Sequence, residues 1–438
     1  MIIMKRSLLF ILCYITLQAG AQRLLTLEEA IATALKQNFD IQLSKNDSAV
    51  AALNYSYRNA AFLPRLNGNL GTTWNNNKQT QEFSNNTKRE GKVKTNNLNS
   101  SVSLNWTLFD GLRMFATRDK AEELVKLGEL GIKQQIINTV ATVINTYYNI
   151  VRQKQLLKAI EEQITLSQER VKLAQYKLDI GVGAKPDVLQ SKVDNNAQKA
   201  LQLEQLTLIS QLKEQLNQAM NVLDAPPYDV SDSIPLNTKL SLGDIQNGLE
   251  TTNPGLLITR KNIDIAGLTL KELRADRFPV VSFNSAYNFS RNNNNLAINP
   301  ALPVFSQNKG FNYGLTATIP IFNGFNTKRL IKQQELNIQY QRMFFDNQKS
   351  QLNLSVINAF LEYEQQKKAL ALEEENILLA KENVSIVFQV YKLNSTTLIQ
   401  LKEAEKSLQD AYTRLITARY NTKLSETELL RLKGDLVK

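Results

Sequence analysis

The residues best placed for polar chemistry stand beside two breaks in otherwise long helical patterns. Asp187 follows the first break and Glu403 the second, with Lys185, Lys192 and Lys402 as nearby bases. An exposed carboxylate–ammonium pair contributes about 0–1 kcal/mol, so such pairs suit a contact that must open and close. For Asp187 a structural explanation is equally good, because an acid in the first turn of a helix interacts favourably with the helix dipole.

The rest of the inventory argues against an enzyme. The chain has no histidine, and its single cysteine, Cys13, lies in an N-terminal apolar run. The common zinc sites and the thiol or histidine-assisted nucleophiles are therefore missing. Adjacent acids such as Glu28 and Glu29, or Glu161 and Glu162, point to different faces of a helix, and no glycine-rich phosphate loop follows a strand. We expect no catalytic residue, no cofactor and no metal site.

The charge pattern does not favour nucleic-acid binding. The formal net charge is +11, and it falls to +9 when Lys5 and Arg6 are removed with the leader described below. Basic residues are mixed with acids along helical patterns, as in Lys367 and Lys368 followed by Glu373–Glu375, which is typical of a solvated helix face. No basic cluster interleaved with aromatic residues is evident in the sequence.

Residues 1–21 have the order of a secretory signal peptide. Lys5 and Arg6 precede the apolar run Ser7–Leu17, and Ala19–Ala21 form an A-x-A site with cleavage expected before Gln22. The run is shorter than the roughly 18 residues of a membrane helix, and no later stretch reaches that length. We therefore expect an exported protein whose mature chain lacks cysteine and disulfides.

Two stretches alternate apolar and polar residues and then run directly into long helical patterns. Leu98–Leu108 and Phe311–Ile321 have the period of two that predicts a strand with one apolar face. Shorter alternating stretches, Leu66–Trp74 and Val281–Phe289, precede them. The strand-to-helix turns are Phe109, Asp110 and Gly111, and, 213 residues later, Phe322, Asn323 and Gly324. The polar segments between the strands, Asn75–Asn97 and Asn292–Lys309, are predicted to be exposed loops.

The long helical patterns form two hairpins. The first helix should extend from Gly111 to about Ile180, roughly 100 Å at 1.5 Å per residue, with coiled-coil spacing inside it. The chain then turns and returns as a helix to about Met220. Leu27 and Leu242, Asn38 and Asn253, and Pro64 and Pro279 recur 215 residues apart. We infer two tandem structural repeats, residues 22–225 and 241–438, joined by an irregular linker at 226–240.

Four two-faced strands cannot close a barrel alone, and open sheet edges are not tolerated in lipid. Closure would need several copies of the chain. The alternative, a soluble sheet with coiled coils attached, does not explain clean alternation in four strands together with export.

These features together resemble the TolC-like outer-membrane efflux channel family. The resemblance rests on the signal peptide, the segment LTLEEAIATALKQN, its echo at Asn253-Pro254-x-Leu256, the two turns and the paired hairpins. It implies an α+β membrane channel: a homotrimer with a shared 12-stranded β-barrel, four strands from each chain, continued by a long α-helical coiled-coil barrel. Such a channel is the outer-membrane exit duct of a tripartite efflux or type I secretion system. It exports small molecules or proteins and extends into the periplasm.

The resemblance also implies partners and a gate. The partners are a periplasmic adaptor protein, an inner-membrane pump and outer-membrane lipid. The hairpin tips would close the periplasmic entrance and contact the adaptor. The residues concerned are Gly181, Gly183 and Asp187 in the first tip, and Asn394, Thr396, Gln400 and Glu403 in the second. Gly181 and Asp187 match the family pattern, but the second tip departs from it. Asn394 replaces the usual glycine, Thr396 a basic residue and Gln400 an aspartate, while Glu403 keeps a neighbouring carboxylate.

A second interpretation is a periplasmic coiled-coil adaptor or scaffold protein without a membrane barrel. Two hairpins and four alternating strands disfavour it. The sequence identifies neither the exported substrate nor the particular pump and adaptor.

Overall fold

The computed structural model describes residues 23–223, 225–295, 298 and 303–437, so the predicted signal peptide lies outside the described residues. The chain divides into two compact units. One comprises Ser48–Gly128 and Thr259–Phe344 and contains a four-stranded sheet. The other, made of the remaining segments, is helical.

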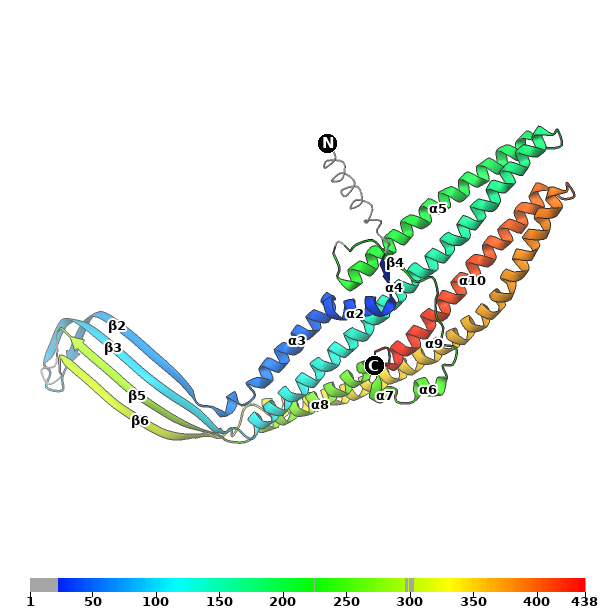
Figure 1. The fold of residues 1–438 in the computed structure, drawn as a ribbon. Coiled ribbons are helices and arrows are strands. Elements are labelled where there is room, and N and C mark those ends of the chain that lie inside the picture. Colours follow the sequence, from blue (N-terminus) through cyan, green and yellow to red (C-terminus); the bar gives the residue numbers. More distant parts are fainter. Residues whose placement is uncertain (1–22, 224, 296–297, 299–302, 438) are drawn as a thin grey trace, which may run out of the picture. The chain divides into compact units, whose positions relative to one another are not determined.

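The sheet unit holds all four predicted strands, in the order β2-β3-β5-β6 with antiparallel neighbours (Figure 1). The strands are β2 (Arg65–Glu82), β3 (Lys88–Phe109), β5 (Val280–Asn294) and β6 (Phe305–Thr318). The prediction of a loop over Asn75–Asn97 was wrong, because β2 and β3 stay paired through the asparagine-rich stretch as far as Glu82 and Lys88. The loop predicted over Asn292–Lys309 is likewise shortened by β5 and β6.

The register places the apolar residues of the four strands on one face. Gly68 pairs with Val102, Val102 with Tyr287, and Tyr287 with Phe311. On the opposite face, amides form a polar row: Asn105 donates to Asn284 at 2.6 Å, and Asn284 donates to Thr316 at 3.2 Å. Strand β6 ends at Thr318 rather than Ile321, because Pro320 has no N–H to donate to a ladder.

Helices of the sheet unit are held to one another by close packing and ion pairs. Helix α3 (Phe39–Ser56) is followed by the short 3₁₀ helix η1 (Ala60–Phe62). A side chain at Gly128 would meet the Ser48 atoms at 3.0–3.2 Å, so α3 and helix α4 (Arg113–Asp179) can approach this closely only because residue 128 is glycine. Lys261 of α8 (Pro254–Ala275) pairs with Glu123 at 2.6 Å.

The predicted long hairpins are present. Helix α4 (Arg113–Asp179) returns as α5 (Lys185–Met220), and α9 (Asn326–Lys392) returns as α10 (Leu398–Lys433) (Figure 1). Both outgoing helices have 67 residues and both returning helices have 36. No helix among the described residues is sufficiently long and apolar to cross a membrane.

The core of the helical unit centres on helix α4. Val143, Tyr147 and Ile150 of α4 are buried against α5 and α2 (Leu27–Gln37), whose N-cap Thr26 accepts a bond from the Glu29 N–H. A second cluster joins the C-terminal part of α9 to α10. A third surrounds the buried Tyr363 and includes Ile245 and Leu249, from the short helices α6 (Leu242–Gln246) and α7 (Leu249–Thr252).

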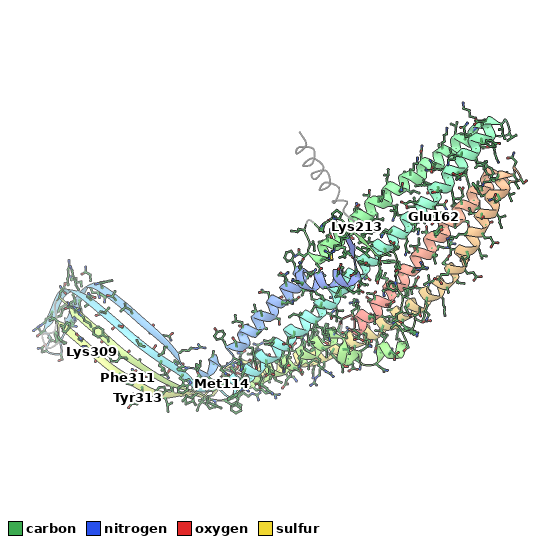
Figure 2. The ribbon with its side chains drawn as sticks, viewed as in Figure 1. Met114, Glu162, Lys213, Lys309, Phe311 and Tyr313 are labelled. Carbon is green, nitrogen blue, oxygen red and sulfur yellow. The ribbon has the colours of Figure 1, made fainter. Side chains whose placement is uncertain are left out.

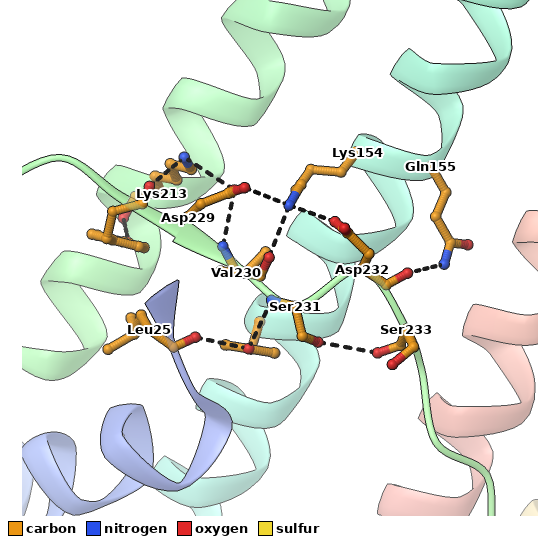
Figure 3. Close-up of polar contacts among 11 residues, drawn as sticks. Leu25, Lys154, Gln155, Lys213, Asp229, Val230, Ser231, Asp232 and Ser233 are labelled. Atoms are coloured by element: carbon orange, nitrogen blue, oxygen red, sulfur yellow. Dashed lines mark hydrogen bonds and ion pairs between the residues drawn. The ribbon is translucent and has the colours of Figure 1, made fainter. Parts of the chain in front are cut away.

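The segment between the predicted repeats is more regular than expected. Strand β4 (Tyr228–Val230) pairs in parallel with β1 (Arg23–Leu25), a bridge that the sequence did not suggest. Lys154 of α4 donates to the Asp229 carboxylate at 2.7 Å and to the Val230 carbonyl at 2.8 Å (Figure 3). Tyr147 donates to the Leu25 carbonyl at 2.9 Å, so part of this segment is fixed against α4.

Candidate functional site

The first hairpin tip is a tight turn that depends on glycine. Gly181 has a φ of +80°, in the left-handed region that glycine adopts at little cost. The N–H groups of Val182 and Gly183 both donate to the Lys177 carbonyl, at 2.9 and 2.8 Å. A side chain at Gly183 would meet the backbone of α4 at 2.8 Å. Asp187 lies half-buried in the first turn of α5.

The second tip makes the same turn with different residues. Asn394 has a φ of +61°, so it takes the left-handed conformation that Gly181 has in the first tip. Asparagine is among the few non-glycine residues that tolerate this conformation. Thr397 caps α10, and Gln400 completes the capping box at 3.3 Å while its side-chain oxygen also accepts a bond from Thr396. Thr396 and Gln400 therefore bond within the tip.

The acids singled out in the sequence are not paired with the expected bases. Among the described residues, Asp187 and Glu403 form no ion pair, and neither do Lys185 and Lys192. Lys402 pairs with a different acid, as described next. The role of Asp187 and Glu403 at an entrance remains a prediction.

Near the tips, a buried cluster of charges connects the two hairpins. This Arg170 cluster consists of Arg170 on α4, Asp194 on α5, and Lys402 and Glu405 on α10. Arg170 binds Asp194 at 3.1 Å and also donates to Glu405, and Lys402 binds Asp194 at 3.0 Å. The side chains of Arg170 and Glu405 are only 4% and 10% exposed, so these contacts are largely shielded from water.

Burial and neighbouring charges push the two acids of the Arg170 cluster in opposite directions. Burial raises the pKa of Glu405, and the charge of Asp194 adds to this, against the attraction of Arg170. Burial also acts to raise the pKa of Asp194, but hydrogen bonds from Gln190 and Lys402 and the two positive charges outweigh it, so the pKa lies below its usual value. One oxygen of Glu405 and the Nε of Arg170 have no hydrogen-bond partner among the described residues. The cluster is therefore strong but incompletely satisfied.

A second bridge between the hairpins lies closer to the tips. The buried Lys177 of α4 donates to the carbonyl of Tyr391 on α9 at 2.6 Å, and its ammonium group is 3.8 Å from the centre of the Tyr391 ring. Burial lowers the pKa of Lys177, although the charge of Asp187 opposes this. Burial raises the pKa of Tyr391, and Asp187 adds to that effect. Asp187 thus acts electrostatically on this bridge.

The sequence did contain a signal for both bridges. Gln163, Arg170 and Lys177 are seven residues apart along α4, and all three are buried. Polar residues at heptad spacing on a buried helix face are costly unless they find partners on another helix.

The two strand-to-helix turns have the same backbone geometry. Gly111 and Leu112 have φ values of +72° and +71°, and Gly324 and Phe325 have +65° and +62°. A side chain at Gly111 would meet the Ala275 carbonyl oxygen at 2.5 Å, whereas the space around Gly324 is open.

The polar residue of each turn stabilises the helix that follows. Asp110 accepts a bond from the Met114 N–H at 3.1 Å, and Asn323 donates to Thr327 at 2.6 Å. Phe109 is the last residue of β3. The Phe322 ring packs edge-on against the Phe325 ring, with 5.3 Å between the ring centres. These turn residues therefore shape the backbone, and no chemistry is evident in them.

The arrangement of a two-faced sheet and two long hairpins matches a known family. The family described as Outer membrane efflux protein matches residues 30–222 and 248–435, and the chain belongs to this family. The chain is accordingly an outer-membrane exit duct that extends into the periplasm, and the predicted family, localisation and general function are confirmed. Members of the family are channels, which fits a protein that is not an enzyme.

Relatives support this assignment at low sequence identity. The outer membrane efflux protein BepC of Brucella suis is 19% identical over 420 residues, covering 93% of this chain and 85% of BepC. The outer membrane protein TolC of Vibrio cholerae is 23% identical over 413 residues, covering 90% and 86%. The CmeC outer membrane channel of Campylobacter jejuni has the same fold, with a TM-score of 0.77, 15% identity, and coverage of 94% of this chain and 86% of that one.

Proposed function

We propose that three copies of the chain close a shared 12-stranded β-barrel, which is continued by a coiled-coil barrel. The open edges of the sheet support this proposal. Among the described residues, strands β2 and β6 each have a paired strand on one side only. In lipid, unpaired edge groups cost several kcal/mol each, so an apolar sheet of this kind needs neighbours. The apolar face would contact lipid, and the row that includes Asn105 and Asn284 would line the interior.

Exposed apolar residues on the helices support the same assembly. On α9, Leu336, Tyr340 and Met343 are 53–64% exposed and follow one another at helical spacing. On α3, Leu43, Val50 and Leu53 form a similar exposed series. Contiguous apolar surface of this kind is typical of a protein interface. Neighbouring copies of the chain would bury it.

We retain the tandem repeats of residues 22–225 and 241–438 as part of this proposal. The equal lengths of corresponding helices and the shared geometry of the two turns support it.

We further propose that the hairpin tips form the periplasmic entrance, with the Arg170 cluster as the single observation that carries this assignment. It joins the two hairpins of one chain, and its unsatisfied polar atoms suit a contact that can open. The residues assigned to the entrance and to adaptor contact are Gly181, Gly183, Asp187, Asn394, Thr396, Gln400 and Glu403.

The duct would receive substrates from an inner-membrane pump through a periplasmic adaptor. One relative, AprF of Pseudomonas aeruginosa, is named as an alkaline protease secretion protein. Small molecules and secreted proteins are both suitable substrates for such a duct.

The assembly is tested on the purified mature protein in detergent. We expect a trimer by light scattering, and fractionation of cells should leave the protein with outer membranes after a salt wash. A monodisperse monomer with unchanged sheet content would refute the shared barrel. A protein released by salt would instead behave as a periplasmic adaptor or scaffold.

The topology is tested by epitope tags. Tags placed in the β2–β3 turn at residues 83–87, or before β6 at residue 303, should be accessible to antibody on intact cells. Detection only after permeabilisation of the outer membrane would reverse the proposed orientation.

A further inference from the structure

The strands of the sheet carry most of their charges on one face. Ten charged residues lie in β2, β3, β5 and β6. The strand register places eight of them on the face of Trp74, Tyr287 and Phe311. The other face has only Arg65 and Arg89 among the strand residues. Six of the eight are basic, and we call them the basic belt: Lys78, Lys88, Lys92, Lys94, Arg291 and Lys309.

The basic belt begins where the apolar and aromatic band ends. Along β6, Tyr313, Phe311 and Lys309 follow at alternate positions toward the loop end of the sheet (Figure 2). Lys309 pairs in register with Phe289, and the Arg291 guanidinium lies 5.9 Å from the centre of the Phe305 ring. Aromatic residues next to basic residues on a lipid-facing surface are typical of the boundary between hydrocarbon and headgroups.

The basic belt has a surplus of positive charge. Glu82 and Glu90 are the acids on this face of the strands, and Glu90 is paired with Lys78. Lys92, Lys94 and Lys309 are exposed and form no ion pair among the described residues. If water surrounded the loop end of the sheet on both faces, charged residues would be expected on both faces. Instead they lie on the face that is apolar nearer the helices. The segregation indicates that this face meets a partner with negative charge.

We propose that the basic belt binds the phosphate groups of lipid headgroups in the outer leaflet of the outer membrane. This inference rests on the proposed function, because it requires the apolar face of the sheet to contact lipid. A lysine or arginine near an anionic membrane surface contributes about 1 kcal/mol to membrane binding. Each lost charge should therefore weaken lipid binding about fivefold. Arg291 can also form bidentate bonds to phosphate, which fixes the geometry of the headgroup.

The test compares two single variants on the same strand. Lys92→Gln removes a charge from the basic belt, and Arg89→Gln removes one from the opposite face three residues away. The probe is lipid A carrying its phosphates, added to the full-length mature protein in neutral detergent. Binding is followed by native mass spectrometry and by the fluorescence of Trp74 and Trp106, the two tryptophans of the chain.

We expect Lys92→Gln to weaken binding about fivefold and Arg89→Gln to leave it unchanged. The triple variant Lys92→Gln, Lys94→Gln, Arg291→Gln should lose on the order of 100-fold. Lipid A stripped of its phosphates should bind the parent protein as weakly as phosphorylated lipid A binds the triple variant. Equal binding of the two lipids, or equal losses in the two single variants, would overturn the inference.

Insertion into phosphatidylcholine vesicles separates this inference from the proposed function. If the parent protein inserts and conducts ions in these neutral vesicles but shows no preference for phosphorylated lipid A, the barrel stands and the lipid site is wrong. If it neither inserts nor conducts, the barrel itself is refuted, and the lipid site with it.

Discussion

Replacing Arg170 by alanine should loosen the contact between the two hairpins and raise the conductance of the channel. The guanidinium group binds acids on two other helices, Asp194 on α5 and Glu405 on α10. Without it, Glu405 is left in a site where its side chain is only 10% exposed. The substitution therefore penalises the arrangement in which the hairpins are joined, because only there is Glu405 held in the buried site. The Asp194 contact lies within the first hairpin and is lost from joined and separated hairpins alike.

The magnitude follows from the surroundings of each acid. Breaking a buried ion pair by removing one partner costs about 3–5 kcal/mol. Asp194 keeps Lys402 at 3.0 Å, so it adds little to this cost. Glu405 can relieve part of its cost by binding a proton, because its pKa is already raised by burial. We therefore expect the lower end, about 3 kcal/mol, which shifts the equilibrium between joined and separated hairpins roughly 150-fold.

The assay is single-channel conductance of reconstituted protein in planar bilayers. The matched control is Lys172→Ala, because Lys172 lies on the same helix and its ion pair with Glu169 at 2.8 Å is exposed on both sides. Exposed pairs of this kind contribute little. Adding Glu405→Gln to Arg170→Ala should restore part of the low conductance, since the buried charge is then absent. The yield of the proposed trimer must be unchanged in all variants.

Equal conductance of Arg170→Ala and Lys172→Ala would refute this reasoning. The Arg170 cluster would then stabilise each chain without controlling the entrance.

Three further predictions follow from the same structure. Because burial raises the pKa of Glu405, the hairpin contact is most stable below the usual carboxyl pKa and weakens as the pH rises through the raised pKa. Single-channel conductance should therefore rise with pH in that window, and Glu405→Gln should remove this pH dependence. Gly183→Ala should increase protease cleavage at the first tip more than Gly181→Ala does. The alanine side chain at 183 would come within 2.8 Å of backbone, whereas at 181 it meets open space and costs about 1–2 kcal/mol for the left-handed φ. Equal cleavage of the two variants would count against the tight turn. Gly111→Ala should lower the dissociation temperature of the proposed trimer in detergent further than Gly324→Ala, because only the first side chain would clash with backbone. A larger drop for Gly324→Ala would contradict this account.

Local patterns predicted the elements of this chain well, and contacts between distant segments explain what they missed. Alternation identified all four strands, and apolar spacing identified α4 and α5 to within a few residues. The asparagine-rich stretch Asn75–Asn97 has no apolar alternation, so it read as a loop. It is strand because β2 and β3 satisfy each other's backbone groups over their whole length.

The candidate site was predicted less well for the same reason. Asn394 was predicted to stand where the family has a glycine, and it adopts a left-handed backbone conformation, with a φ of +61°. The heptad spacing marks Arg170 as a polar residue on a buried helix face, but it does not identify Glu405, 235 positions away, as its partner. The basic belt was missed because its charges are spread over four strands that only the sheet brings side by side.

The heptad spacing of Gln163, Arg170 and Lys177 also sets the alignment of the helices along their length. Two apolar coiled coils can slide past each other by one heptad, about 10 Å, with little loss of packing. Here a slip in one direction would set the uncharged Gln163 against Glu405, and a slip in the other would set Lys177 there, so either slip separates Arg170 from Glu405. Lys177 would lose the Tyr391 carbonyl in the same movement. The two buried contacts thus favour one lengthwise alignment of the hairpins over alignments displaced by a heptad.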